Sequence, residues 1–240
     1  MSQYHAHTPI LIEADVHNAN PIFAICGTPG SGKSTLAIHL AEALKPASDS
    51  SSGSRSTVHI DIDHYQSFTE QAIDDIQLWL AAGGDYNLFQ IPQLDDDLVA
   101  LKEGISTRLP GSEEPVTANG PILFESHFGR EHHASGQHID FMIWLETPLD
   151  LALARNVRAF CEDFLSAEES HHHGQIQWLE GYLQNYQQSV RATLAQQSRR
   201  LSAAADLILD GQQSIESLTQ QALGAITQYI AKGHQRQGDS

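Results

Sequence analysis

The stretch that most constrains the fold of this chain is FAICGTPGSGKSTLAIHL, residues 23–40. A short apolar run leads into a glycine-rich turn, and a lysine with two hydroxyl residues then opens a segment of helix-forming residues. The turn fits the pattern G-x-x-x-x-G-K-[ST], in which glycines let backbone N–H groups point inward around phosphate oxygens. A strand before the turn and a helix after it are the context that this pattern requires, so the stretch predicts a phosphate-binding loop.

Two residues of this loop have chemistry of their own. We expect Lys33 to reach the β and γ phosphates of a nucleotide, and the Ser34 hydroxyl to ligate Mg²⁺. The predicted nucleotide-binding residues are Gly27, Thr28, Pro29, Gly30, Ser31, Gly32, Lys33, Ser34 and Thr35. Because kinases, switch GTPases and motors share such a loop, the class of protein depends on the rest of the chain.

Short apolar runs of strand type alternate along the chain with longer segments of helical spacing. The predicted strands are residues 22–26, 58–62, 122–124, 141–145 and 207–209, and the predicted helices are residues 36–44, 149–160 and 176–194. Strands separated by helices need crossover connections, which favours a mostly parallel sheet that is covered on both faces. We therefore expect a three-layer α/β sandwich.

Three segments lie outside this alternation. Residues 1–20 form an N-terminal extension, in which PILIEA is compatible with an edge strand or with a helical turn. Residues 46–57 are a serine-rich linker. Residues 161–175 are polar and interrupted between two predicted helices, as expected for a lid. The main domain is predicted over residues 21–235.

Charge and composition exclude several classes of partner. Thirteen basic and thirty acidic residues give a formal net charge of −17, which repels nucleic acids and anionic lipid surfaces. Cys26 and Cys161 cannot form a disulfide framework. From the sequence we expect neither a cleavable leader nor a membrane helix, which needs an apolar run of about 18 residues. We expect a cytoplasmic protein with a small-molecule partner, and self-association to form a homo-oligomer stays open.

Acidic residues follow two strand-type runs, near the edge where open α/β sheets bind ligands. Asp61 and Asp63 lie two apart in VHIDIDHYQSF, so they project to the same side if the strand continues. Asp63 is the candidate base for an attacking hydroxyl, or a ligand of Mg²⁺ through water. Glu125 ends the run ILFE, where an acid can orient Mg²⁺. The alternatives are a solvated loop acid for Asp63 and a polar neighbour for Asp61.

Cations and histidines supply further candidates. Arg155 and Arg158 are three apart on a predicted helix, so one face could clamp a transferring phosphoryl group. The alternative is a surface pair that balances Glu162 and its neighbours. His127 is a candidate substrate contact, or simply an exposed loop residue. We expect residues 171–173, three histidines, to form an exposed tract rather than a metal site, because adjacent helical positions cannot converge on one ion.

Taken in order, several stretches resemble the uridine kinase and phosphoribulokinase group of P-loop kinases. They are GTPGSGKST, the strand ending in Asp63 with Tyr65 close behind, GGDYNLFQIPQLDDDLVALKEG, ILFES, LETPLDLALARNVR and AAADLILDG. Together they span residues 21–211. The stretch GDYNLFQIP followed by LKEG is similar to the segment that frames the acceptor pocket in that group, although an ordinary helix-loop-helix would give the same pattern.

The resemblance implies a five-stranded parallel sheet, ATP and Mg²⁺ as cofactors, and phosphoryl transfer to a primary hydroxyl. It implies that Lys33 and Ser34 serve phosphate and metal, that Asp63 is the base, and that Glu125 is the strand-end acid. The two arginines of the LARNVR stretch would be the cations on the lid side. No guanine-reading Asn-Lys-x-Asp string occurs in the chain, which disfavours a GTPase.

The chain departs from the group where its members recognise the pyrimidine and ribose. The corresponding interval, ISTRLPGSEEPVTANG, contains one cation and no aromatic residue, so a stacked base lacks its partner. Asn156 replaces the second arginine of the lid helix. The acceptor is therefore open among a sugar, a vitamin-like alcohol and another nucleoside. The candidate substrate residues are Tyr65, Tyr86, Arg108 and His127, with Phe89 assigned to core packing.

Two functions of different classes are compatible with these features. The first is a small-molecule kinase, which Asp63 and the acceptor-framing segment favour. The second is a non-catalytic or regulatory ATP-binding protein that controls a partner through the segment EESHHHG. The reduced number of lid arginines favours the second function.

Overall fold

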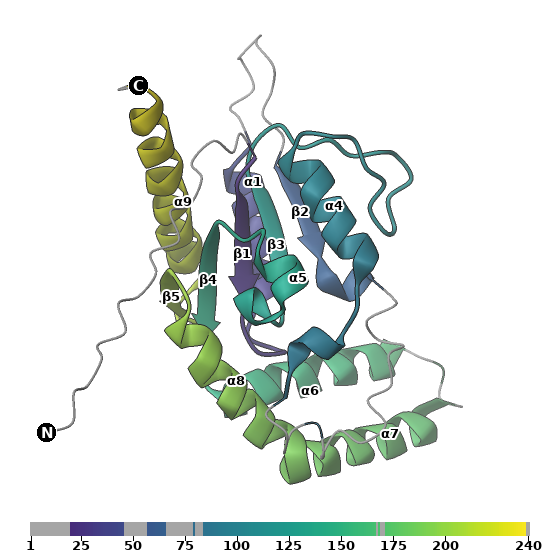
Figure 1. The fold of residues 1–240 in the computed structure, drawn as a ribbon. Helices are drawn as coiled ribbons and strands as arrows, with labels where there is room; N and C mark the ends of the chain where they lie inside the picture. The colour runs from purple at the N-terminus through teal and green to yellow at the C-terminus, as the bar shows by residue number, and fades with distance from the viewer. Residues whose placement is uncertain are drawn as a thin grey trace, which may run out of the picture.

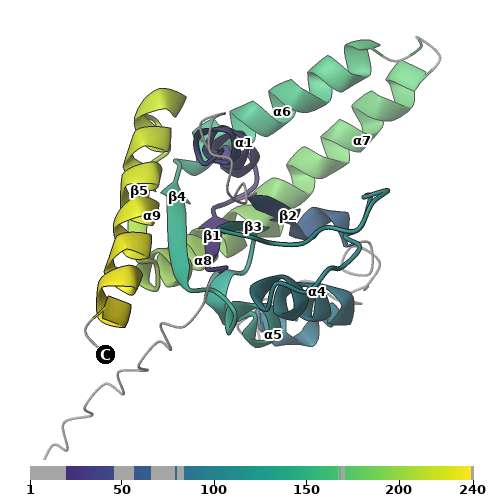
Figure 2. The ribbon, with the colours of Figure 1, turned by 90° about the horizontal axis from the view of Figure 1, so that it is seen from above.

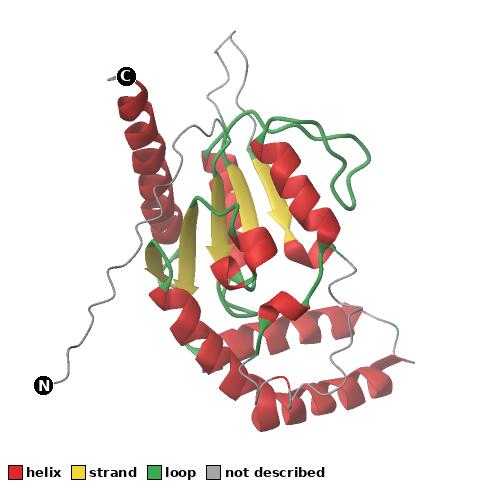
Figure 3. Ribbon diagram, in the orientation of Figure 1, coloured by secondary structure: helices red, strands yellow, loops and turns green. Residues whose placement is uncertain are grey.

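The computed structural model describes residues 20–45, 57–65, 79, 84–166, 168 and 171–238 of the chain. Five strands form one parallel sheet in the order β2-β3-β1-β4-β5 (Figure 1, Figure 3). Their bounds are β1 Ile22–Cys26, β2 Val58–Asp61, β3 Ile122–Ser126, β4 Phe141–Glu146 and β5 Leu207–Asp210. The predicted three-layer α/β fold with a five-stranded parallel sheet is confirmed.

Helices cover both faces of the sheet. Successive side chains of a strand point to opposite faces, and because apolar side chains project from both faces, each face needs a layer of helices. In β1, Phe23 and Ile25 belong to one hydrophobic cluster, and Ala24 and Cys26 belong to the other. The first cluster lies under α1 (Lys33–Ala43) and α9 (Ile215–Gly238), and the second under α4 (Pro92–Lys102), α5 (His133–Gly136) and α8 (Arg191–Ala203). Every side chain of β1 is fully buried, as expected for the central strand of a covered sheet.

Two further helices leave the body of the molecule side by side (Figure 2). These are α6 (Leu149–Ser166) and α7 (His172–Asn185), which we name the α6–α7 arm. The rings of Phe160 and Trp178 meet edge to face across the arm, with centroids 4.9 Å apart. A π-helical segment, Tyr186–Val190, connects α7 to α8.

The strand predicted over residues 58–62 is shorter in the structure. The Asp61 side chain accepts a hydrogen bond from the backbone N–H of Asp63 at 2.9 Å, and this contact starts a 3₁₀ turn over Ile62–His64. A capping acid of this kind ends the extended conformation. The prediction of a strand that ends in Asp63, with both acids on the same side, is therefore wrong.

The polar interruption predicted over residues 161–175 is also shorter. Residues 161–166 belong to α6 and residues 172–175 belong to α7. Phe160 and Phe164 lie four apart on α6 and both contact Trp178, so packing between the two helices extends the first of them. The helix predicted over residues 176–194 covers α7 from Ile176 onward, the π-helical segment and the start of α8.

The predicted N-terminal extension, residues 1–20, lies outside the described residues except for Asn20. The predicted linker, residues 46–57, lies outside them except for Thr57. None of the helices in the described part of the chain combines the length and the apolar character that crossing a membrane requires.

Candidate active site

The predicted phosphate loop connects β1 to α1 and follows a path that requires glycine. Gly30 and Gly32 have φ angles of 76° and 102°, in the left-handed region. A Cβ atom at Gly30 would lie 2.2 Å from the carbonyl oxygen of Ala152. A Cβ atom at Gly27 would lie 2.5 Å from the hydroxyl of Ser31. The loop thus packs so closely on α6 and on itself that side chains at these positions would displace its backbone.

Two hydroxyl groups of the loop lack a partner among the described residues. The Oγ1 atom of Thr28 and the Oγ atom of Ser31 are both buried without a hydrogen bond. The helix behind the loop, α1, starts without a side-chain cap and has no acid in its first turn. The first N–H groups of such a helix are donors that suit an anion. The loop therefore fits a phosphate group, which would accept hydrogen bonds from these donors.

Lys33 places a buried cation in the same loop. Its side chain is 7% exposed, and Nζ donates a hydrogen bond to the carbonyl oxygen of Thr28 at 3.4 Å. Burial lowers the pKa of Lys33, while the carboxylates of Glu125 and Asp63 act in the opposite direction. A phosphate group in the loop would offset the loss of hydration of this cation, which is a second reason why the site fits a polyphosphate.

Glu125 joins the loop to β2. It is 2% exposed. Its Oε2 atom accepts a hydrogen bond from the Ser34 hydroxyl at 2.7 Å, and its Oε1 atom lies 2.7 Å from Nε2 of His59. Glu125 lies inside β3 rather than after it, because Cys26 pairs with Ser126 and extends the strand by two residues beyond the prediction. Hydroxyl and carboxylate oxygens are ligands that Mg²⁺ prefers, so the pair of Ser34 and Glu125 fits the predicted metal role.

Asp63 stands on the 3₁₀ turn after β2, opposite the end of β3. Its Oδ1 and Oδ2 atoms lie 3.0 Å and 3.3 Å from Nε2 of His127. The hydrogen bond from His127 is the largest cause that lowers the pKa of Asp63, and the positive charge of Lys33 acts in the same direction. Half of the Asp63 side chain stays exposed. The turn therefore presents an ionised carboxylate to solvent beside the loop.

The two candidate clamp arginines have different partners. Arg155 donates to the carbonyl oxygens of Ser31 and Gly211, each at 3.1 Å, so it ties the phosphate loop to the end of β5. Arg158 pairs with Glu162 at 2.9 Å, and its side chain is 81% exposed. The structure brings Arg155 to the loop and leaves Arg158 on the surface of the arm, where the surface-pair interpretation expected it.

Tyr65 takes part in a buried network rather than pointing a free hydroxyl at a substrate. Its hydroxyl donates to Oδ2 of Asp97 at 3.0 Å, and the Thr107 hydroxyl donates to Oδ1 of Asp97 at 2.6 Å. Burial raises the pKa of Tyr65, and the charge of Asp97 adds to the effect. Asp97 is 4% exposed. The network joins the turn that carries Asp63 to α4 and to the loop that follows α4.

The other two candidate substrate residues lie apart from the phosphate loop. Tyr86 is buried and stacks on Phe128, with ring centroids 4.7 Å apart, and the Arg200 guanidinium lies 5.5 Å from the Tyr86 ring centroid. Arg108 is exposed. Phe89 packs against the core, stacked on Phe128, as predicted. The acceptor-framing stretch folds as a 3₁₀ turn, Tyr86–Leu88, followed by α4.

Three residues of the site were missed by the sequence analysis. His59 lies two residues before Asp61 in β2, and this spacing places it on the same face of the strand as Asp61. Asp97 and Gln197 gave no local signal, since Tyr65 lies 32 residues from Asp97, Thr107 lies 10 residues from Asp97, and His127 lies 70 residues from Gln197.

The histidine tract joins the arm rather than the site. Residues 172 and 173 belong to the first turn of α7. Among the described residues, no three or more His, Cys, Asp or Glu side chains form a group that could hold a metal ion.

The strand order 2-3-1-4-5 and the glycine loop between the central strand and the first helix define a P-loop NTPase fold. No protein-family profile and no curated protein sequence matches the chain.

Three solved structures are similar to the chain over most of its length. A provisionally named fructose transport system kinase from Silicibacter sp. TM1040 is 21% identical with a TM-score of 0.46, over 80% of this chain and 90% of the other. Shikimate kinase from Acinetobacter baumannii, in complex with shikimate, is 18% identical with a TM-score of 0.41, over 87% and 94%. A sugar kinase from Janibacter sp. HTCC2649 is 14% identical with a TM-score of 0.42, over 88% and 97%. These three structures are named as small-molecule kinases, and their similarity to the chain is distant.

Proposed function

We propose that this protein transfers a phosphoryl group from ATP to a hydroxyl group of a small metabolite, in the manner of the uridine kinase-like enzymes that its sequence resembles. The observation that carries the proposal is the position of Asp63. It is an ionised and half-exposed acid, and it lies close enough to Lys33 of the phosphate loop for the lysine charge to lower its pKa. A nucleotide switch has no need of a base aimed at a substrate hydroxyl.

The residues of the loop have the roles of binding and orientation. Backbone N–H groups of the loop over residues 27–35, to which Pro29 contributes none, and the hydroxyls of Thr28 and Ser31 hold the phosphates, and Lys33 neutralises their charge. Ser34 and Glu125 hold Mg²⁺, either directly or through its water shell. The metal ion supplies charge neutralisation of the phosphoryl oxygens. Arg155 fixes the loop from behind through its two bonds to backbone carbonyls.

Asp63 accepts the proton of the acceptor hydroxyl, and His127 orients the Asp63 carboxylate. General-base groups of this kind contribute about 10²- to 10⁴-fold in rate. Arg158 is assigned to the transferring phosphoryl group only in a conformation in which it leaves Glu162. The reaction class is therefore phosphoryl transfer with an alcohol as acceptor.

The test is ADP release across a panel of sugars, alditols, vitamin-like alcohols and nucleosides. We expect at least one compound to stimulate release, and Asp63→Asn to abolish the stimulation while ATP binding persists. Asp95→Asn is the matched control, because Asp95 also pairs with a histidine, His138, at 2.8 Å but in α4, away from the loop. Loss of stimulation in the control as well would count against a specific role for Asp63.

One observation favours a second function, that of an ATP-binding regulatory protein. Arg158 pairs with Glu162 in solvent and Arg155 is bonded to backbone carbonyls, so neither clamps a phosphoryl group in this conformation. A regulator that controls a partner through the α6–α7 arm needs no clamp. ATP binding without stimulation by any acceptor would support this second function.

A further inference from the structure

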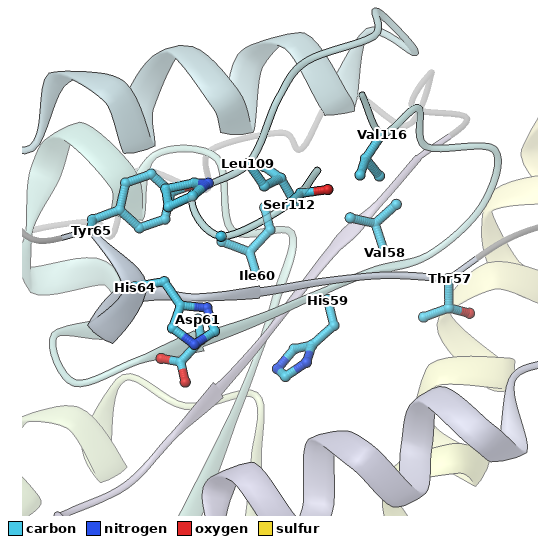
Figure 4. A pocket seen from close by; sticks show the side chains of 12 residues that line it. Thr57, Val58, His59, Ile60, Asp61, His64, Tyr65, Leu109, Ser112 and Val116 are labelled. Carbon is cyan, nitrogen blue, oxygen red and sulfur yellow. The ribbon is translucent and has the colours of Figure 1, made fainter. Parts of the chain in front are cut away.

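A pocket of about 360 Å³ lies along the outer edge of β2, beside the turn that carries Asp63 (Figure 4). Small-molecule sites usually have volumes of about 300–1,000 Å³, so the pocket has room for a ligand of monosaccharide to nucleoside size. One wall is β2 with the turn after it, and the opposite wall is the loop over residues 109–116. The ligand considered for this pocket is the acceptor of the kinase reaction, so its assignment rests on the proposed function.

The opposite wall is held in place by several contacts. Thr107 and Val116 exchange two backbone hydrogen bonds of 2.9 Å and 2.7 Å, which close the loop at its base. The hydroxyl of Ser112 bonds the carbonyl oxygen of Glu114 at 2.6 Å. Asp97 bonds both Thr107, at the base of the loop, and Tyr65, at the end of β2. Both walls of the pocket are therefore tied to the same buried carboxylate.

The polar side chains in the pocket are one carboxylate, two imidazoles and three hydroxyls, from Asp61, His59, His64, Thr57, Ser112 and Tyr65, of which the Tyr65 hydroxyl already donates to Asp97. The Thr57 hydroxyl is buried without a hydrogen-bond partner among the described residues. The backbone adds a donor: Val58 N–H bonds Pro121 toward β3, so the N–H of the next residue in this edge strand points outward, to the pocket. These groups suit a ligand with several hydroxyls, which both donate and accept.

The charge of the lining is negative. No lysine or arginine is among the described residues that line the pocket, and the Arg108 side chain next to it is exposed. An anionic group in the pocket would meet the Asp61 carboxylate without a compensating cation. The apolar part of the lining, formed by Val58, Ile60, Leu109 and other side chains, suits C–H surfaces such as the face of a sugar ring.

The pocket is connected to the candidate reaction site through two of its own residues. Asp61 accepts the hydrogen bond from the Asp63 N–H, and His59 contacts Glu125, which bonds Ser34 of the phosphate loop. A ligand in the pocket would therefore lie against the residues that position the candidate base, Asp63, and the candidate Mg²⁺ ligand, Glu125. Binding far from the reacting atoms can position a substrate for the chemical step.

From this arrangement we infer that the pocket binds the part of the acceptor remote from the transferred phosphoryl group, and that the acceptor is a polyhydroxylated compound without a negative charge. An acceptor with a carboxylate or a phosphate would meet the Asp61 carboxylate, and the described residues of the lining include no lysine or arginine to compensate it.

The first experiment measures binding without turnover. Calorimetry or ligand-observed NMR is performed on the full chain with D-glucose, D-ribose, xylitol and uridine, with and without a non-hydrolysable ATP analogue. D-glucuronate keeps the glucose ring and adds a negative charge, and ribose 5-phosphate does so for ribose. We expect an uncharged compound to bind about tenfold or more tightly than its anionic counterpart. Equal or tighter binding of an anionic counterpart, or no binding by any uncharged member, would overturn the inference.

The second experiment tests the pocket itself with two matched variants. Ser112→Trp fills the pocket, whereas Glu113→Trp places the same side chain at an exposed neighbouring position that does not line it. We expect Ser112→Trp alone to weaken binding of the uncharged compound by about tenfold or more, with unchanged affinity for the ATP analogue. Equal binding by both variants would show that the compound binds elsewhere.

A third variant tests the charge argument. Asp61→Asn keeps an oxygen that can accept the hydrogen bond from the Asp63 N–H but removes the negative charge. The affinity ratio of the anionic to the uncharged compound should rise by about tenfold, and an unchanged ratio would contradict selection by charge. The two proposals fail separately. Binding in the pocket without ADP release would contradict only the proposed kinase function. ADP release that Ser112→Trp does not affect would contradict only the assignment of the pocket to the acceptor.

Discussion

The imidazole of His127 holds Asp63 by both carboxylate oxygens, at 3.0 Å and 3.3 Å from Nε2. The backbone carbonyl of His127 in turn accepts a hydrogen bond of 2.6 Å from the side chain of Gln197, a buried residue of α8. These contacts link three parts of the fold: the turn that follows β2, the end of β3, and α8. An acid with so fixed an orientation suits catalysis, because a general base acts only within hydrogen-bond reach of its proton.

The first prediction is that His127→Gln raises the pKa of Asp63, because the hydrogen bond from His127 is the largest cause that lowers it. A lowered pKa stabilises the folded state above the unfolded value of about 3.9, and this contribution is lost as the pH falls through the folded value. NMR titration of the Asp63 carboxyl carbon measures the shift. His138→Gln, which breaks the pair with Asp95, is the control that should leave Asp63 unchanged. An unaltered pKa in His127→Gln would refute the pairing.

The second prediction concerns the buried cation of the phosphate loop. Lys33→Ala removes the ammonium group that the phosphates would meet, so affinity for MgATP should fall by about tenfold to a hundredfold. Calorimetry with MgATP measures this change. Lys45→Ala is the control, since Lys45 forms an exposed ion pair with Glu42 at the end of α1. Equal affinity in wild type and Lys33→Ala would remove the basis for the phosphate site.

The third prediction separates the two arginines of α6. Arg155→Ala should lower the free energy of unfolding by about 1–2 kcal/mol, because it removes the charged donor of the Ser31 and Gly211 carbonyls, although Ser31 keeps the Thr147 hydroxyl as a donor. Arg158→Ala should change it by no more than about 0.5 kcal/mol, since its partner Glu162 is exposed as well. Urea unfolding of both variants compares them. If Arg158 moves to the phosphoryl group during turnover, Arg158→Ala lowers kcat at unchanged stability; an unchanged kcat would reject that role.

The fourth prediction compares two glycines, Gly30 with no room for a Cβ atom and Gly224 with open space around it. Gly30→Ala forces a left-handed residue against the carbonyl of Ala152 and should destabilise the fold by about 2–3 kcal/mol. Gly224 lies within α9 with no atom near enough to touch an added methyl group, so Gly224→Ala should stabilise by about 0.5–1 kcal/mol. Thermal unfolding gives both signs. A stable Gly30→Ala protein would mean that the loop does not have this backbone path.

The sequence predicted what local patterns determine. The phosphate loop depends on neighbouring residues, so its glycines, its lysine and its flanking strand and helix could be located before the structure was known. The order of strands and helices along the chain then favoured a parallel sheet, because crossover connections leave few arrangements. Strand ends were less accurate: pairing with β1 lengthens β3 to Ser126, and capping by Asp61 ends β2.

Contacts between distant residues set the limit of the sequence analysis. Arg155 looked like a clamp on helical spacing alone, but its guanidinium bonds Ser31 in a loop 124 residues earlier. His127 looked like an isolated loop histidine, and only the fold brings it to Asp63. Asp97 gave no signal in its acidic stretch, although it is the buried acceptor of two hydroxyls.

The fifth prediction tests that buried acceptor. Tyr65→Phe and Thr107→Val each remove one hydrogen bond to Asp97, and each should cost about 1–3 kcal/mol in the free energy of unfolding. The double variant should cost more than the sum, because Asp97 is 4% exposed and a buried carboxylate that loses both of these donors is strongly destabilising. Urea unfolding of the four proteins gives the coupling energy. Strictly additive losses would mean that Asp97 is solvated when its partners leave, so that the acid does not join the two walls of the pocket.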